Sequence, residues 1–170
     1  MHSKKVEGGK FGFPVATQLG PLLLENNLCD DWATFFVRHR LGQQFRVSGK
    51  RYRDRQLNAL WRRLQIVVPK LFADVRVEPS LLHGDLHIAN SAAYEERLGQ
   101  WQPLLFDPAS FWGDAEFDLV LRWLVGVGEN LKYNQAFYDA YFAARPQVSI
   151  FIVSLVASAT KRKKKKIKKI

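Results

Sequence analysis

Residues 83–90 read HGDLHIAN, and residues 106–111 read FDPASF. The first stretch places Asp85 five positions before Asn90, and Asp107 follows seventeen positions later at the start of the second stretch. The separation suits a short β-hairpin, with polar residues around Gly99 forming its turn. Because a hairpin returns the chain to its starting point, we expect Asp85, Asn90 and Asp107 to lie together.

The order of these three residues is that of catalytic groups in kinase-like folds. The carboxylate of Asp85 can accept the proton of a substrate hydroxyl. Asn90 offers a neutral oxygen and Asp107 a charged one, and Mg²⁺ prefers hard oxygen ligands. The order predicts phosphoryl transfer, with Asp85 as the catalytic base and Asn90 and Asp107 as metal ligands. Taken singly, each residue is more often found in a turn or a cap.

Three other polar residues accompany this order. His83 is expected to orient the backbone of the loop, because Asp85 already fills the role of base, and it is grouped with the two metal ligands at the predicted cofactor site. His87 has no second metal ligand at helical spacing and is interpreted as structural. Asp118 lies on a following helix, where it either accepts backbone N–H groups of the loop or is an exposed helix acid.

Apolar spacing predicts a mostly helical chain with one small hairpin. Asp30 and Asp31 open a first helix, which Gly42 can close. A second helix is predicted from Asp54 to Val68, and Pro69 is expected to end it. This helix carries an apolar stripe that is most simply assigned to the core, formed by Leu57, Leu60, Trp61 and Leu64.

The remaining elements surround the predicted site. Two strands are expected at 91–93 and 101–106, joined by a polar turn. Asp114 can cap a helix with apolar residues at helical spacing, and a further helix is predicted from Asn134 to Phe142.

Composition supports one folded body with a chemically different tail. The chain has 170 residues, 47% of them apolar, and a formal charge of +10, but eight Lys or Arg lie in the last ten residues and leave +2 for the rest. We therefore expect no nucleic-acid partner for the body. Cys29 is the one cysteine, which excludes an internal disulfide. No apolar run has the length of a membrane span or an export signal, so a cytoplasmic location is expected.

The chain is divided into a polar leader over 1–10, a folded body over 11–146 and a tail over 147–170. The tail joins an apolar run to the polybasic run Lys161–Ile170. It is open to three interpretations, which are a membrane-surface anchor, a nuclear-import tract and the translation of A-rich non-coding DNA. We favour the third, in which the tail is an artefact of the gene model.

The body resembles the fructosamine kinases, which include the protein-ribulosamine and ketosamine 3-kinases. The resemblance covers about residues 11–146, and its most specific stretches are LHGDL at 82–86 and FDPASF at 106–111. It implies an α+β, protein-kinase-like fold similar to that of aminoglycoside phosphotransferases. It further implies that this chain carries only the C-terminal lobe, without the N-terminal lobe that holds the nucleotide.

The resemblance also implies an activity. Such enzymes use ATP and Mg²⁺ to phosphorylate the 3-hydroxyl of a ribulosamine or fructosamine on a protein lysine, and the adduct then leaves. By position, Asp85 corresponds to the base and Asn90 and Asp107 to the Mg²⁺ ligands. Because no Gly-rich loop and no strand-borne Lys precede the site, we expect no ATP turnover by this chain alone. The alternative is a non-catalytic, ketosamine-binding fragment or pseudokinase, and a fuller gene product could supply the absent lobe or the last helices.

Overall fold

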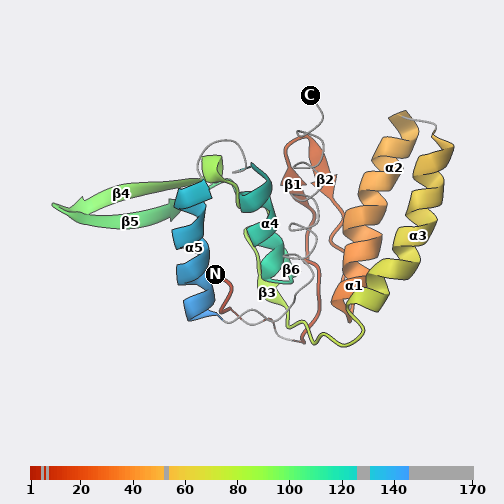
Figure 1. Ribbon diagram of the computed structural model, residues 1–170, viewed down its shortest axis with the longest axis horizontal. Helices are drawn as coiled ribbons and strands as arrows, with labels where there is room; N and C mark the ends of the chain where they lie inside the picture. Colours follow the sequence, from red (N-terminus) through yellow and green to blue (C-terminus); the bar gives the residue numbers. More distant parts are fainter. Residues whose placement is uncertain (5, 7, 52–53, 126–130, 146–170) are drawn as a thin grey trace, which may run out of the picture.

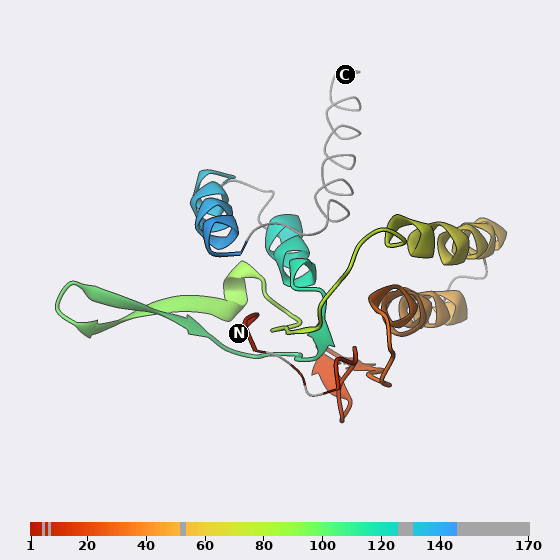
Figure 2. The ribbon, with the colours of Figure 1, turned by 90° about the horizontal axis from the view of Figure 1, so that it is seen from below.

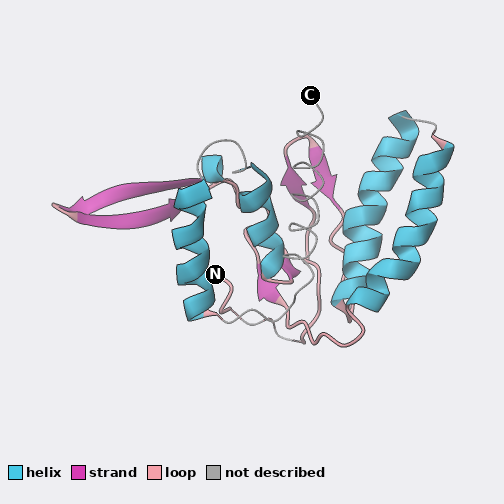
Figure 3. Ribbon diagram, viewed as in Figure 1, coloured by secondary structure: helices cyan, strands magenta, loops and turns pink. Residues whose placement is uncertain are grey.

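A computed structural model describes residues 1–4, 6, 8–51, 54–125 and 131–145 of the chain. It shows helices combined with small antiparallel strand pairs, an α+β arrangement (Figure 3). The tail predicted over 147–170 lies outside the described residues. Within them, no helix is long and apolar enough to cross a membrane.

The first helical segment begins after Asp31, whose Oδ1 accepts the Thr34 N–H at 2.8 Å. It continues without a break through three elements, which are α1 (Trp32–Phe35), the π-helical η1 (Phe36–Leu41) and α2 (Gly42–Arg51). The prediction that Gly42 closes this helix was therefore wrong. Gly42 has helical φ and ψ of −60° and −41°, so it does not adopt the left-handed conformation of a glycine that ends a helix.

Helix α3 (Arg55–Leu71) lies beside α2, and Trp61 stacks on Phe45 across this pair with ring centroids 4.7 Å apart (Figure 1). Pro69 does not end the helix, because it lies in the last turn, where the Phe72 N–H still donates to its carbonyl. The predicted core stripe was also wrong in part. Leu60 is 49% exposed, and Val68 is the buried residue of the helix.

The strands form three separate antiparallel pairs. In the first, β1 (Thr17–Leu19) pairs with β2 (Leu22–Leu24), and in the second, β3 (Ser80–Leu81) pairs with β6 (Trp112–Gly113). In the third, β4 (Ser91–Arg97) pairs with β5 (Gln100–Leu105), which confirms the predicted hairpin, although its first strand extends beyond the predicted 91–93. This hairpin projects away from the helices in both views (Figures 1 and 2).

Two helices follow the last strand, and a short 3₁₀ helix precedes the hairpin. They are α4 (Glu116–Val125), α5 (Leu131–Ala144) and η2 (Ile88–Asn90). Asp114 Oδ1 accepts the Glu116 N–H at 3.0 Å, so its predicted role at the start of α4 is confirmed. The loop that carries Asp85 runs between β3 and η2, close to α4.

An aromatic core joins the first helix to the strands around the site. Its buried members are Phe11, Trp32, Phe35, Val68, Phe72, Leu82 and Phe111. The buried Arg40 guanidinium lies over two of these rings, 4.6 Å from the Phe35 centroid and 3.9 Å from that of Phe111. It also donates to the Glu25 carbonyl at 2.9 Å and to Asn26 Oδ1 at 2.7 Å. Burial lowers the pKa of Arg40 to about 9.

We predict that Arg40→Met lowers the free energy of unfolding by about 2–4 kcal/mol, because one buried and one partly buried oxygen lose a charged donor. Arg38→Met removes a neighbouring, exposed arginine and should change the free energy of unfolding by less than about 0.5 kcal/mol. Urea denaturation of both variants measures the difference. Equal effects would show that Arg40 contributes nothing beyond an ordinary surface arginine.

Candidate functional site

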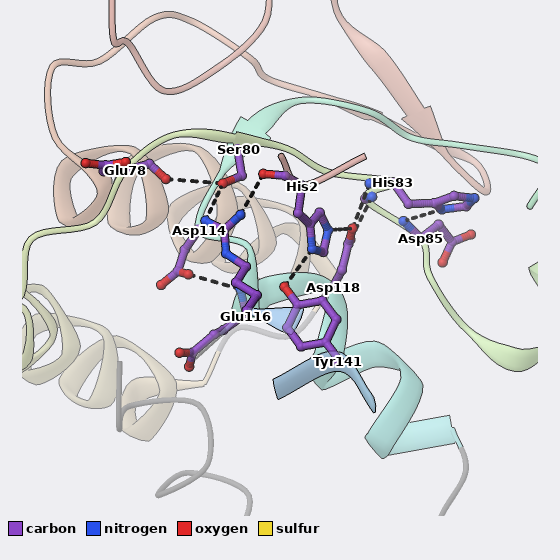
Figure 4. Close-up of polar contacts among 11 residues, drawn as sticks. His2, Glu78, Ser80, His83, Asp85, Asp114, Glu116, Asp118 and Tyr141 are labelled. Atoms are coloured by element: carbon purple, nitrogen blue, oxygen red, sulfur yellow. Dashed lines mark hydrogen bonds and ion pairs between the residues drawn. The ribbon is translucent and has the colours of Figure 1, made fainter. Parts of the chain in front are cut away.

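The turn at residues 83–84 is held by one buried carboxylate. Asp118, on α4, is fully buried; its Oδ2 accepts the His83 N–H at 2.7 Å and its Oδ1 accepts the Gly84 N–H at 2.8 Å (Figure 4). Of the two roles left open for Asp118, the backbone acceptor is confirmed and the exposed helix acid is wrong.

Gly84 lets the loop approach the stretch that contains Asp107. Its φ of +82° suits glycine, and an added Cβ would lie 2.1 Å from the Ala109 carbonyl oxygen. The Ala109 N–H in turn donates to the His83 carbonyl at 2.8 Å. The two sequence stretches that define the site are therefore in direct backbone contact.

His83 also links these two stretches through its ring. Its Nδ1 accepts the Asp85 N–H at 3.3 Å, so the proton is assigned to Nε2, which donates to the Phe106 carbonyl at 3.0 Å. The side chain is buried, and both ring nitrogens are engaged within the chain. This geometry favours the orienting role. Direct contact of His83 with a cofactor stays a prediction.

Asp85 and Asn90 are hydrogen-bonded to each other. Asn90 Nδ2 donates to the Asp85 carbonyl at 3.0 Å and to Asp85 Oδ2 at 3.1 Å. His87 Nε2 lies 3.6 Å from the same Oδ2. Within the described residues, Asp85 Oδ1 and Asn90 Oδ1 have no partner, and the Asp85 side chain is 20% exposed. The loop therefore leaves one carboxylate oxygen of Asp85 without a partner, and one amide oxygen of the buried Asn90.

Asp107 lies next to Asp85 and Asn90, because the end of the β4–β5 hairpin returns to the point where the hairpin begins. The Phe106 N–H donates to the Asn90 carbonyl at 3.2 Å, which confirms the predicted return of the two ends. Among the described residues, Asp107 is the one residue other than glycine with a positive φ, at 56°. Strained backbone of this kind is concentrated at functional sites. The Asp107 side chain is exposed and has no hydrogen bond within the described part of the chain.

The donor set around Asp107 fits Mg²⁺ bound jointly by protein and phosphate. Mg²⁺ usually takes one or two protein oxygens and completes its shell with water and phosphate oxygens. Asp107 supplies a free carboxylate, and Asn90 supplies Oδ1, because its Nδ2 is used by Asp85. No group of three His, Cys, Asp or Glu within the described residues could hold a metal alone.

Sequence reasoning missed the residues on the other side of Asp118. His2 Nε2 lies 2.9 Å from Asp118 Oδ2, and its Nδ1 lies 2.7 Å from the Tyr141 hydroxyl. Arg145 donates to the His2 carbonyl at 2.6 Å and to Ser80 Oγ at 3.0 Å. These contacts join residues far apart in the chain, and no spacing in the sequence indicates them.

Comparisons with known proteins show which family the chain is similar to. The sequence model of fructosamine kinase matches residues 1–152, which includes the stretch that was expected to be a leader. Mouse ketosamine-3-kinase is 37% identical over 142 residues, which are 84% of this chain and 43% of the relative. The chloroplastic protein-ribulosamine 3-kinase of Arabidopsis thaliana is 33% identical over 147 residues, which are 86% of this chain and 42% of the relative.

A solved structure from Thermobifida fusca, assigned to fructosamine-3-kinase, covers 84% of this chain and 46% of its own, with a TM-score of 0.69 and 24% identity. At that identity the likeness shows the fold, which is kinase-like. The sequence comparisons are more specific, and the chain belongs to the fructosamine kinase family. It spans less than half the length of the curated relatives named here.

Gly84→Ala should lower the free energy of unfolding by about 3 kcal/mol or more, because the new methyl group meets the Ala109 carbonyl. Gly99→Ala is the matched control, since its φ is +76° but nothing lies within 4 Å of an added Cβ. It should cost only about 1 kcal/mol. Thermal and urea unfolding measure both, and a Gly99→Ala effect as large as that of Gly84→Ala would contradict the close approach.

Asp114 should make stability depend on pH. Burial raises the pKa of Asp114 to about 6, and its Oδ2 has no hydrogen-bond partner in the described structure. A raised pKa means that the ionised form is disfavoured in the folded state. The stability that protonated Asp114 contributes to the fold is therefore fully present below the usual pKa of 3.8. It is lost as the pH rises through about 6.

Relative to wild type, Asp114→Asn should gain about 2–3 kcal/mol of stability as the pH rises from about 4 to about 7, because asparagine does not ionise. Asparagine retains the oxygen that caps α4. Asp54→Asn, at the exposed N-cap of α3, is the control and should show no such gain. Urea unfolding at several pH values across this range measures the free energy of unfolding of each protein. Parallel pH profiles of that free energy for Asp114→Asn and wild type would contradict the prediction.

Proposed function

We propose that this chain carries the catalytic loop and the metal loop of a protein-ribulosamine 3-kinase. The reaction transfers the γ-phosphoryl group of ATP to the 3-hydroxyl of a ribulosamine or fructosamine on a protein lysine, which leads to deglycation. The observation that carries the proposal is the Asp85–Asn90 pair beside Asp107, in a chain of the fructosamine kinase family.

Asp85 is suited to act as the base. Asn90 holds Oδ2, which leaves Oδ1 free to accept the proton of the substrate hydroxyl. As that proton leaves, the hydroxyl oxygen bonds to the γ-phosphorus, the bond from phosphorus to the bridging oxygen breaks, and ADP departs with its electron pair. A general base of this kind contributes roughly 10²–10⁴-fold to the rate.

Asn90 Oδ1 and the Asp107 carboxylate would hold Mg²⁺. When bound, the metal neutralises charge on the phosphate oxygens. The protein's own contribution is to fix the two ligands: the hydrogen bond between Phe106 and Asn90 sets their separation, and the bond between His83 and Phe106 orients the peptide before Asp107.

We also propose that the described body corresponds to the C-terminal lobe of the kinase-like fold. None of the six described strands contains a Lys that could reach a nucleotide phosphate. The chain also spans only 42–43% of the two curated relatives named above. By this proposal the chain alone does not turn over ATP, and a fuller gene product would supply the nucleotide lobe. The cytoplasmic location stays a prediction.

The test uses a peptide with ribulosamine or fructosamine on lysine, MgATP, and mass spectrometry to detect the added phosphate. We expect no phosphate transfer by this chain alone. A longer product that includes a nucleotide lobe should transfer phosphate, and Asp85→Asn in that product should slow the transfer by roughly 10²–10⁴-fold. Asp54→Asn, at an exposed helix cap, is the control.

The outcomes separate the parts of the proposal. Turnover by this chain that disappears in Asp85→Asn would contradict its inactivity and support the assigned base. A longer product that transfers phosphate equally well with Asp85→Asn would contradict the assigned base. Peptide binding without any turnover, independent of MgATP, would favour the alternative of a non-catalytic ketosamine-binding protein.

A further inference from the structure

The N-terminal turn packs against the carboxylate that holds the catalytic loop. His2 is nearly buried, with a side chain 12% exposed, and it lies between Asp118 on α4 and Tyr141 on α5 (Figure 4). Arg145 donates to the His2 carbonyl at 2.6 Å, so the backbone of this residue is held as well as its ring. A loosely attached terminus would show neither kind of contact.

The hydrogen-bonding role of His2 Nε2 follows from its neighbour. An ionised carboxylate can only accept, so Nε2 carries a proton and donates to Asp118 Oδ2 at 2.9 Å. Its Nδ1 lies 2.7 Å from the Tyr141 hydroxyl, and the tautomer of the ring sets which of the two atoms donates. Burial raises the pKa of Tyr141 to about 12, so this hydroxyl keeps its proton.

Asp118 depends on few donors. Its three hydrogen bonds come from the N–H groups of His83 and Gly84 and from the His2 ring. Among the described side chains, His2 is the one that donates to it. A buried carboxylate is costly unless it is fully hydrogen-bonded, so the loss of one donor in three weakens its hold on the other two.

We propose that His2 is a positioning residue for the catalytic loop. It supplies the side-chain donor that fixes Asp118, and Asp118 fixes the backbone turn directly before Asp85. Through this chain of bonds, the position of the N-terminal turn and of α5 determines how firmly the loop is held. The inference rests on the proposed function only in that it calls this loop catalytic.

Amide hydrogen exchange of the full chain tests the proposal without an activity assay. In His2→Ala we expect the amides of His83 and Gly84 to exchange at least about tenfold faster, because their shared acceptor is loosened. Amides in the middle of α3, such as that of Leu64, should exchange as in wild type. Lys4→Ala changes an exposed side chain of the same turn and is the matched control.

Two conservative variants separate positioning from simple packing. The side-chain amide of glutamine can place its NH₂ near the position of histidine Nε2, whereas that of asparagine reaches only the position of Nδ1. We expect His2→Gln to restore most of the protection at His83 and Gly84, and His2→Asn to resemble His2→Ala. This pair also keeps the proposal testable if His2→Ala does not fold.

Three results would overturn the proposal. One is exchange at His83 and Gly84 in His2→Ala equal to that in Lys4→Ala. Another is a uniform acceleration that includes α3, which would indicate a general loss of stability. The third is equal protection by glutamine and asparagine. A longer product that includes a nucleotide lobe but does not phosphorylate ketosamine peptides would instead contradict the proposed function, and the exchange result would stand separately.

Discussion

The structure around the candidate site depends on one buried carboxylate, that of Asp118. It accepts two consecutive backbone N–H groups from the turn before Asp85 and a third bond from His2. Within the described residues, these three donors are what compensates for its burial. The loop and α4 are therefore held in one arrangement, because moving either one would leave the carboxylate without its donors.

That constraint extends to the metal loop through backbone contacts. Gly84 packs on the Ala109 carbonyl, and His83 bonds with both Ala109 and Phe106. Asp107 lies between these two contacts, which explains how a residue other than glycine is kept at a positive φ. A rigid pair of loops can present oxygens to a metal without rearrangement, and preorganisation of this kind is what phosphoryl transfer asks of a protein.

The sequence predicted what local signals encode. The hairpin, the cap at Asp114 and the return of Asp107 to Asn90 follow from spacing and residue type, and the structure confirms them. The predicted ends of two helices were wrong, because Gly42 adopts helical backbone angles and Pro69 lies within the last turn of α3. The contacts of His2 could not be predicted, since they join the two ends of the described chain.

The proposed metal site formed by Asn90 and Asp107 beside Asp85 can be tested directly. The most direct measurement is paramagnetic broadening of amide NMR signals by Mn²⁺, which replaces Mg²⁺ at oxygen sites. Broadening is expected to be strongest at residues near 85–90 and 106–108 and to be lost in Asp107→Ala. Broadening centred on other acids, such as Glu95 and Glu96 of the exposed hairpin, and unchanged in Asp107→Ala would contradict it.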